Sequence, residues 1–200
     1  MKKLIAIILF FPLASIAQDN ERFIAKGLFS GKGTLAAGQM TAFKATNMYV
    51  SGNLEYYIED NISFRGGLYF FLGTSNAALP FSKNSTCFTG FYYHPKTNNR
   101  LDPYIGFEPG ISWTQLKAPN NGSIETYPYN ISTYPQSINP LASVTAGVNY
   151  YATTFTHLFI EAKYVQGIHT SDIPAVSLSE FRIAFGFGFN IWTIKNHKTT

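Results

Sequence analysis

The sequence is poor in charge. Only 13% of its 200 residues are charged, about half of the usual 25%, while aromatic residues make up 16%. A secreted soluble domain needs many charged residues on its surface, and this composition supplies few. Without Lys2 and Lys3 the chain keeps 13 Lys plus Arg against 11 Asp plus Glu, a balance of +2. So small and scattered an excess indicates no nucleic-acid partner.

The chain also lacks the residues for several kinds of site. Cys87 is its one cysteine, which excludes an internal disulfide, and no Cys/His cluster has metal-ligand spacing. It contains no P-loop or dinucleotide fingerprint. After residue 17, no stretch approaches the roughly 18 apolar residues of a membrane helix. We therefore expect no metal, no cofactor and no helical membrane span.

The first residues have the layout of a secretory signal peptide. Two lysines precede an apolar run from Leu4 to Leu13, and a small-residue exit ends at Ala17. A membrane anchor is the alternative, but the run is too short to cross about 30 Å of hydrocarbon, and Pro12 interrupts it. We expect cleavage after Ala17, which leaves residues 18–200 as one domain with a short tail, residues 193–200.

Apolar and polar residues alternate along the rest of the chain, with turn residues between the segments. No segment shows a convincing helical repeat. The alternation predicts eight strands: 26–35, 47–58, 61–72, 86–95, 102–115, 140–151, 157–168 and 179–192.

The predicted connections alternate in length. Those after the first, third, fifth and seventh strands are long (36–46, 73–85, 116–138 and 167–178), and those after the second, fourth and sixth are shorter. Short turns at one end and long loops at the other are typical of outer-membrane barrels, and eight is an allowed strand number. The fold class we predict is all-β, an eight-stranded antiparallel up-and-down transmembrane β-barrel.

One face of each strand carries no charge. In "FRIAFGFGFNIW", every second residue from Phe181 to Ile191 is apolar, and glycines and charges lie between. A charge facing lipid costs up to about 2–4 kcal/mol at the midplane of the bilayer, so the uncharged face suits lipid contact. The alternative is a soluble lipocalin-like barrel with the phenylalanines around an internal ligand.

The other face carries four cations and four anions whose charges sum to zero. A narrow interior tolerates buried ions chiefly as paired sets, whereas an ion-selective pore favours rings of one sign. Eight strands also leave little room for a channel. We therefore predict a charge network that closes the lumen, with a small pore as the alternative. The residues are Lys32, Glu55, Arg65, Glu108, Glu161, Lys163, Glu180 and Arg182.

Two segments do not fit this scheme. Pro109 lies within a predicted strand and removes a backbone donor, which predicts a bulge or an early end there. The segment "CFTGFYYHP" carries apolar residues on both faces, so its facing stays open.

The chain resembles the small OmpA/OmpX-type outer-membrane β-barrel family of Gram-negative bacteria. The resemblance lies in "NLEYYIEDNISFRGGLYFFLG", "LDPYIGFEPGISW", "LFIEAKYVQGIHTSDI" and the closing "FRIAFGFGFNIW". It implies a bacterial outer-membrane location, outer-membrane lipid as a partner and a scaffold role, and it specifies no ligand. The eight residues after Trp192 are too few for a peptidoglycan-binding domain.

One stretch raises an enzymatic alternative. "GIHTSDI" places His169 two residues before Ser171, with Glu180 on the next strand, and a His–Ser pair oriented by a carboxylate can form an acyl-transfer nucleophile. The element is similar to that of outer-membrane lipid A deacylases, although Asp172 replaces their usual asparagine. The alternation also assigns His169 to the inward face, which disfavours a site open to lipid. We therefore expect no catalytic residues.

The longest loop is a candidate contact surface. Residues 119–136 are rich in Asn, Pro, Ser and Tyr and almost uncharged. Long loops in compact domains are usually functional or disordered. An extracellular protein or saccharide could bind there, or the loop could be a mobile shield without a ligand.

Overall fold

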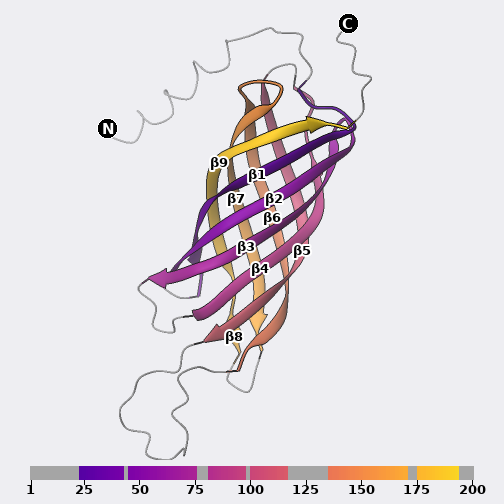
Figure 1. Cartoon of the computed structure of the whole chain (residues 1–200). Helices are drawn as coiled ribbons and strands as arrows, with labels where there is room; N and C mark the ends of the chain where they lie inside the picture. The colour runs from indigo at the N-terminus through magenta and orange to yellow at the C-terminus, as the bar shows by residue number, and fades with distance from the viewer. Residues whose placement is uncertain are drawn as a thin grey trace, which may run out of the picture.

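The computed structural model describes residues 23–42, 45–75, 81–97, 100–116, 135–170 and 175–193. Strands dominate these ranges and incline across the axis of a barrel (Figure 1). Within them, no helix is long and apolar enough to span a membrane. The strands are β1 (Leu28–Met40), β2 (Thr46–Glu59), β3 (Ile62–Ser75), β4 (Phe81–Tyr93), β5 (Leu101–Leu116), β6 (Ser137–Tyr151), β7 (Thr156–His169), β8 (Val176–Ser177) and β9 (Glu180–Trp192).

The eight long strands close on themselves. From β1 to β7 each strand pairs with the next in antiparallel fashion. β9 then pairs with β7 on one side and with β1 on the other. The two-residue β8 adds a short pairing to the end of β7. The predicted closed eight-stranded antiparallel barrel is confirmed.

The two ends of the barrel differ in their connections. We call the end with links β2–β3, β4–β5 and β6–β7 the turn end; β1 starts and β9 finishes there. The opposite end, with links β1–β2, β3–β4, β5–β6 and β7–β9, is the loop end.

Several strands extend further toward the loop end than the sequence predicts. β1 continues to Met40, and β4 begins at Phe81, so the first two predicted long connections shorten to residues 41–45 and 76–80. Pairing explains the difference, because Ala36 to Gln39 have partners on both β2 and β9. The β5–β6 and β7–β9 connections remain long.

The predicted division into two faces is confirmed. Along β9 the odd-numbered residues are exposed, and Phe185 and Phe187 reach 73% and 72%. The charged residues Glu180 and Arg182 are buried. The phenylalanines therefore do not line the interior, and the lipocalin-like alternative is wrong. β4 also gains an assignment: Thr86, Phe88 and Tyr92 point inward and Phe91 outward.

The bulge or early end expected at Pro109 is wrong, although the pairing of β5 with β4 lapses there, between Phe88↔Gly110 and Phe91↔Phe107. β5 runs unbroken through this residue, and its register with β6 is constant, with Glu108 opposite Ser143 and Gly110 opposite Leu141. The proline lies on the exposed face. Irregularities lie elsewhere: the register shifts at Met48/Tyr49, at Tyr57/Glu59 and at Phe81/Lys83.

Inward glycines make room for the aromatic filling. A Cβ atom on Gly106 would lie 2.5 Å from the Tyr92 ring, and one on Gly147 would lie 2.5 Å from the Tyr104 ring. Each tyrosine therefore lies across a position that has no side chain. A narrow barrel can hold large rings in this way without widening.

Candidate functional site

The interior is the candidate site because polar side chains from all eight long strands meet there. The eight charged residues assigned inward from the sequence are each at most 4% exposed: Lys32, Glu55, Arg65, Glu108, Glu161, Lys163, Glu180 and Arg182. Ions removed from water in this way need partners, and the contacts below supply them.

Arg65 joins two carboxylates near the middle of the barrel. Its two terminal nitrogens lie 2.9 Å from Glu55 Oε2 and 3.1 Å from Glu161 Oε2. The hydroxyls of Tyr69 and Tyr104 also donate to Glu161, over 3.1 and 3.0 Å. Charge-assisted bonds of this kind are among the stronger polar contacts in proteins, so Arg65 ties β2, β3 and β7 together through the lumen.

Lys32 adds a second cation to the same cluster. Its Nζ lies 3.4 Å from Glu55 Oε2 and 4.5 Å from the centre of the Tyr104 ring. Both contacts favour the charged ammonium. Glu55 therefore faces two cations from neighbouring strands.

A second cluster lies nearer the loop end. Arg182 Nε donates to Glu180 Oε2 over 2.8 Å, and its NH1 donates to Thr86 over 2.8 Å. Tyr49 and Asn47 donate to the two oxygens of Glu180, each over 2.8 Å. Partners from β2, β4 and β9 thus hold this ion pair in place.

Lys163 and Glu108 form the third cluster. The ammonium donates directly to Glu108 Oε2, and Thr145 donates to the same oxygen over 3.0 Å. The Lys163 ammonium also lies 4.5 Å from the centre of the Phe88 ring. Thus each of the four carboxylates assigned inward has a cation beside it.

Sequence reasoning missed two residues of the site, Asp102 and His94. Both are buried, and His94 Nδ1 lies 2.8 Å from Asp102 Oδ1. On the other side of the ring, Nε2 lies 3.1 Å from Glu55 Oε1 and 3.0 Å from Ser63 Oγ. Asp102 lies an even number of residues before Glu108 on the same strand, so its inward direction could have been predicted from the sequence. His94 follows β4, whose facing the sequence left open.

These contacts raise the pKa of His94. Burial by itself lowers it, but hydrogen bonds to Asp102 and Glu55, with the charges of the same two carboxylates, outweigh burial and bring the pKa above the ordinary 6.5. The ring lies just beyond the end of β4. A histidine between two carboxylates therefore favours the imidazolium form.

Ser63, His94 and Asp102 have the order of contacts found in a serine hydrolase triad. All three are at most 1% exposed, and Ser63 donates to Glu55 Oε1 over 2.5 Å. A nucleophile needs access to its substrate, which this burial denies. Among the described residues no group of three or more His, Cys, Asp or Glu could hold a metal ion.

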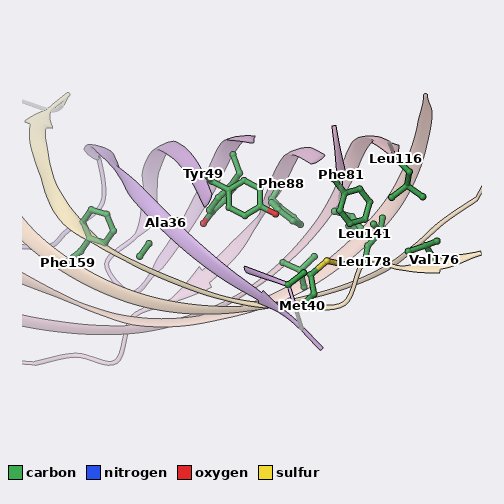
Figure 2. Packing of buried hydrophobic residues seen from close by; sticks show 14 residues of the cluster. Ala36, Met40, Tyr49, Phe81, Phe88, Leu116, Leu141, Phe159, Val176 and Leu178 are labelled. Carbon is green, nitrogen blue, oxygen red and sulfur yellow. The ribbon is translucent and has the colours of Figure 1, made fainter. Parts of the chain in front are cut away.

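Apolar side chains fill the loop end of the lumen (Figure 2). They come from β1, β4, β5, β6, β8 and the segment before β9, and each is at most 7% exposed. Because they are large and packed together, they separate the ion pairs from the loops. These residues, which we call the apolar cap, are Met40, Phe81, Leu116, Leu141, Val176 and Leu178.

At the turn end the chain before β1 covers the lumen. Phe23 is buried and stacks on Tyr151, with ring centroids 5.5 Å apart. The backbone N–H of Gly27 donates to the carbonyl oxygen of Tyr57, and the backbone N–H of Thr193 donates to the carbonyl oxygen of Gly27. Residues 23–27 are therefore fixed to both β2 and the end of β9.

The structure does not bring His169 and Glu180 together. His169 is buried, and its Nδ1 lies 2.6 Å from Thr114 Oγ1. Glu180 pairs with Val165 in the β7–β9 register, four residues and about 13 Å along the strand from His169. Ser171 lies outside the described residues. Glu180 is thus engaged by Arg182 and its neighbours and does not orient the histidine.

Comparison with known proteins identifies the fold. No family model matches the chain, and no curated protein matches it. Among solved structures, the N-terminal β-barrel domain of Pseudomonas aeruginosa OprF has a TM-score of 0.53 at 14% identity, covering 84% of this chain and 99% of that one. P. aeruginosa OprG gives 0.58 at 12% identity over 85% and 98%. Neisserial surface protein A gives 0.55 at 14% over 84% and 98%. These structural neighbours are OmpA/OmpX-like outer-membrane barrels, and this chain has their eight-stranded fold.

Proposed function

We propose that this chain is a bacterial outer-membrane protein that acts as a scaffold, displays its loops outside the cell and neither conducts nor catalyses. The observation that carries the proposal is the filled lumen. Three sets of ion pairs occupy it, the apolar cap covers the loop end, and Phe23 packs over the turn end. This filling supports a lumen without a continuous water path.

The outer wall supports lipid as its partner. Within the described strands, the exposed charges are Glu59, the last residue of β2, and Lys83, the third residue of β4. The wall between them is uncharged and mostly apolar, as contact with acyl chains requires. Because outer-membrane barrels have short periplasmic turns, the loop end would face outward.

Conductance in planar bilayers tests the closed lumen. We expect the purified, refolded chain to give no discrete current steps under conditions where a porin of known conductance does. Reproducible steps would show that ions pass the network and would favour the pore. A heat-shift assay on the same sample verifies that the inserted protein is folded.

The hydrolase alternative has a direct test. Mass spectra of lipid A from cells with and without the chain should be identical, because Glu180 is held away from His169. Loss of an acyl chain on expression, abolished by His169→Ala, would instead establish a deacylase.

The β5–β6 connection is our proposed contact surface for a protein or saccharide. Most of the stretch 119–136 lies outside the described residues, so the proposal rests on its length and composition. Replacing residues 119–134 by a Gly/Ser segment of equal length should reduce cell adhesion or binding to a glycan array. The matched control replaces residues 152–154 of the β6–β7 turn, which belongs to the turn end. Unchanged binding in the first variant would end this proposal.

A further inference from the structure

The buried charges do not balance without a histidine. Asp102 is 0% exposed and joins the four carboxylates identified from the sequence, which makes five. Only four lysine and arginine side chains are equally buried among the described residues. The carboxylates are Glu55, Asp102, Glu108, Glu161 and Glu180, and the cations are Lys32, Arg65, Lys163 and Arg182.

His94 occupies the place where the missing charge is needed. Glu108, Glu161 and Glu180 each have a cation of their own cluster. Asp102 instead meets His94 Nδ1 at 2.8 Å. The other ring nitrogen meets Glu55 at 3.1 Å. A neutral imidazole donates through one nitrogen only. With Nδ1–H on Asp102, its Nε2 lone pair would face Glu55 Oε1, and Ser63 would have to turn its hydroxyl from Glu55 to that nitrogen.

We propose that His94 is a protonated latch: its imidazolium bridges Asp102 and Glu55, completes the buried charge balance, and releases the turn end of the barrel when it loses its proton. The ligand of this site is a proton, and the device responds to the pH on the turn-end side of the membrane.

Charged and titratable groups surround the ring from every neighbouring strand. β2 contributes Glu55 and Tyr57, and the Tyr57 ring lies 4.7 Å from His94. β5 contributes Asp102 and Tyr104, with the Tyr104 ring 5.7 Å away. Lys32 and Arg65 from β1 and β3 reach Glu55 from its far side, and Tyr92 precedes the histidine on β4. Tyr151 from β6 lies 3.4 Å from the Tyr57 hydroxyl, and the His157 ring from β7 lies 5.4 Å from the Tyr151 ring. The half-buried Arg100 before β5 lies 5.8 Å from the Phe23 ring.

The latch is connected to the segment that closes the turn end. Tyr57 and Tyr151 both direct their hydroxyls to Asp102 Oδ2, at 3.3 and 3.4 Å. Phe23 stacks on the Tyr151 ring. If His94 becomes neutral, Asp102 keeps neutral donors, among them Asn149 at 2.7 Å, but it loses its cationic partner. A buried carboxylate without a cation destabilises the end of the barrel that these rings close. Local opening beneath Phe23 is the expected consequence.

The sign of the pH effect follows from the raised pKa of His94. Because the folded barrel binds this proton more tightly than an unfolded histidine of pKa 6.5 does, the latch contributes its full stability below about that pH. The contribution disappears as the pH rises through the raised value. Alkaline conditions therefore loosen the turn end and acidic conditions close it.

Nitrogen-15 NMR of the histidine side chains in the refolded chain gives the direct test. We expect His94 to titrate above the ordinary 6.5, with both ring nitrogens protonated at and below that pH, and Asp102→Asn to shift its titration to lower pH. His94→Gln assigns the signal. A ring that carries only one proton at pH 6.5 would overturn the proposal, since the fifth charge would then come from another group.

Unfolding in urea from pH 5 to pH 9 provides the second readout. The wild-type midpoint should fall as the pH rises above 6.5, while that of His94→Gln should be lower at pH 6 and should fall less steeply across the window. His169→Gln is the matched control: it removes a buried histidine at the loop end whose Nδ1 faces Thr114, and it should keep the wild-type pH profile. Should His94→Gln fail to fold, the wild-type NMR titration decides alone. An equal slope in wild type and His94→Gln would contradict the latch.

Discussion

The inner and outer walls of this barrel are built from the same strands and follow opposite rules. On β9, Arg182 points inward and is 2% exposed, whereas Phe185 points outward and is 73% exposed. Inside, every buried charge needs a partner, and glycine gives room to large rings. Outside, charge is confined to strand ends, and a glycine such as Gly66 has no atom within 4 Å of an added Cβ.

This contrast shows that alternate residues of one strand can suit two different environments, the inside and the outside of the barrel. A soluble protein hides its apolar residues and exposes its charges. Here the charges lie in the core among aromatic and other apolar side chains, and further apolar residues form most of the surface. The same substitution should therefore have opposite effects on the two walls, which makes the contrast testable by mutation.

The largest effect is expected from removing one charge inside. Arg65→Met leaves Glu55 and Glu161 close together without the guanidinium that separates them. Breaking a buried pair typically costs about 3–5 kcal/mol. Urea unfolding of the refolded chain in phospholipid vesicles measures the loss. A change below about 1 kcal/mol would show that the network does not stabilise the barrel.

Adding one charge outside should be the next most harmful change. Phe185→Arg places a cation in the middle of the exposed face of β9. At the bilayer midplane this costs about 2–4 kcal/mol. The same unfolding assay applies, with Lys83→Arg, which keeps the charge near the loop end, as the control. If Phe185→Arg unfolds like the wild type, the outer wall does not meet hydrocarbon.

Replacing glycine by alanine should also distinguish the inner wall from the outer wall, with smaller changes in the unfolding free energy. Gly106→Ala drives a methyl group into the Tyr92 ring, and such overpacking costs about 1–3 kcal/mol. Gly66→Ala meets no atom and should be neutral or add up to about 1 kcal/mol by restricting the unfolded chain. Equal effects of the two substitutions would contradict the division of space described above.

The smallest effect is expected from an ion pair outside the barrel. Lys26 and Glu59 lie 3.1 Å apart at the turn end, and both side chains are more than half exposed. Pairs of this kind contribute about 0–1 kcal/mol. Lys26→Met should therefore change the unfolding free energy far less than Arg65→Met. A comparable loss would mean that burial is not what makes the inner pairs important.

The alternation of residues was enough to predict the architecture and the facing of most strands. A shift of one residue moves every side chain to the other wall, so the placement of Glu161 and Lys163 followed from parity alone. Asp102 has the same inward parity as Glu108 and is the first residue of the predicted strand 102–115, but it was not assigned to the charge network. Strand ends were harder, because residues 36–40 carry few large apolar side chains and are held in β1 by pairing on both sides.

Partners within the lumen could not be predicted. Which carboxylate meets Arg65 depends on the stagger of strands across the barrel, and three register shifts alter that stagger. The sequence also gave no reason to place His94 between Asp102 and Glu55, since β4 carries apolar residues on both faces. For Pro109 the local rule was sound, but the missing donor was tolerated without a shift of register with β6.

The native cysteine offers the most direct test of which wall meets lipid. Cys87 lies in the middle of β4, beside the outward-facing Leu68 and Ile111. A nitroxide label on this residue, in the chain refolded into vesicles, reports collisions with oxygen, which enters hydrocarbon, and with a water-soluble nickel chelate. Frequent collisions with oxygen and few with nickel are the predicted result. Preferential collisions with nickel would place this wall in water and contradict the account.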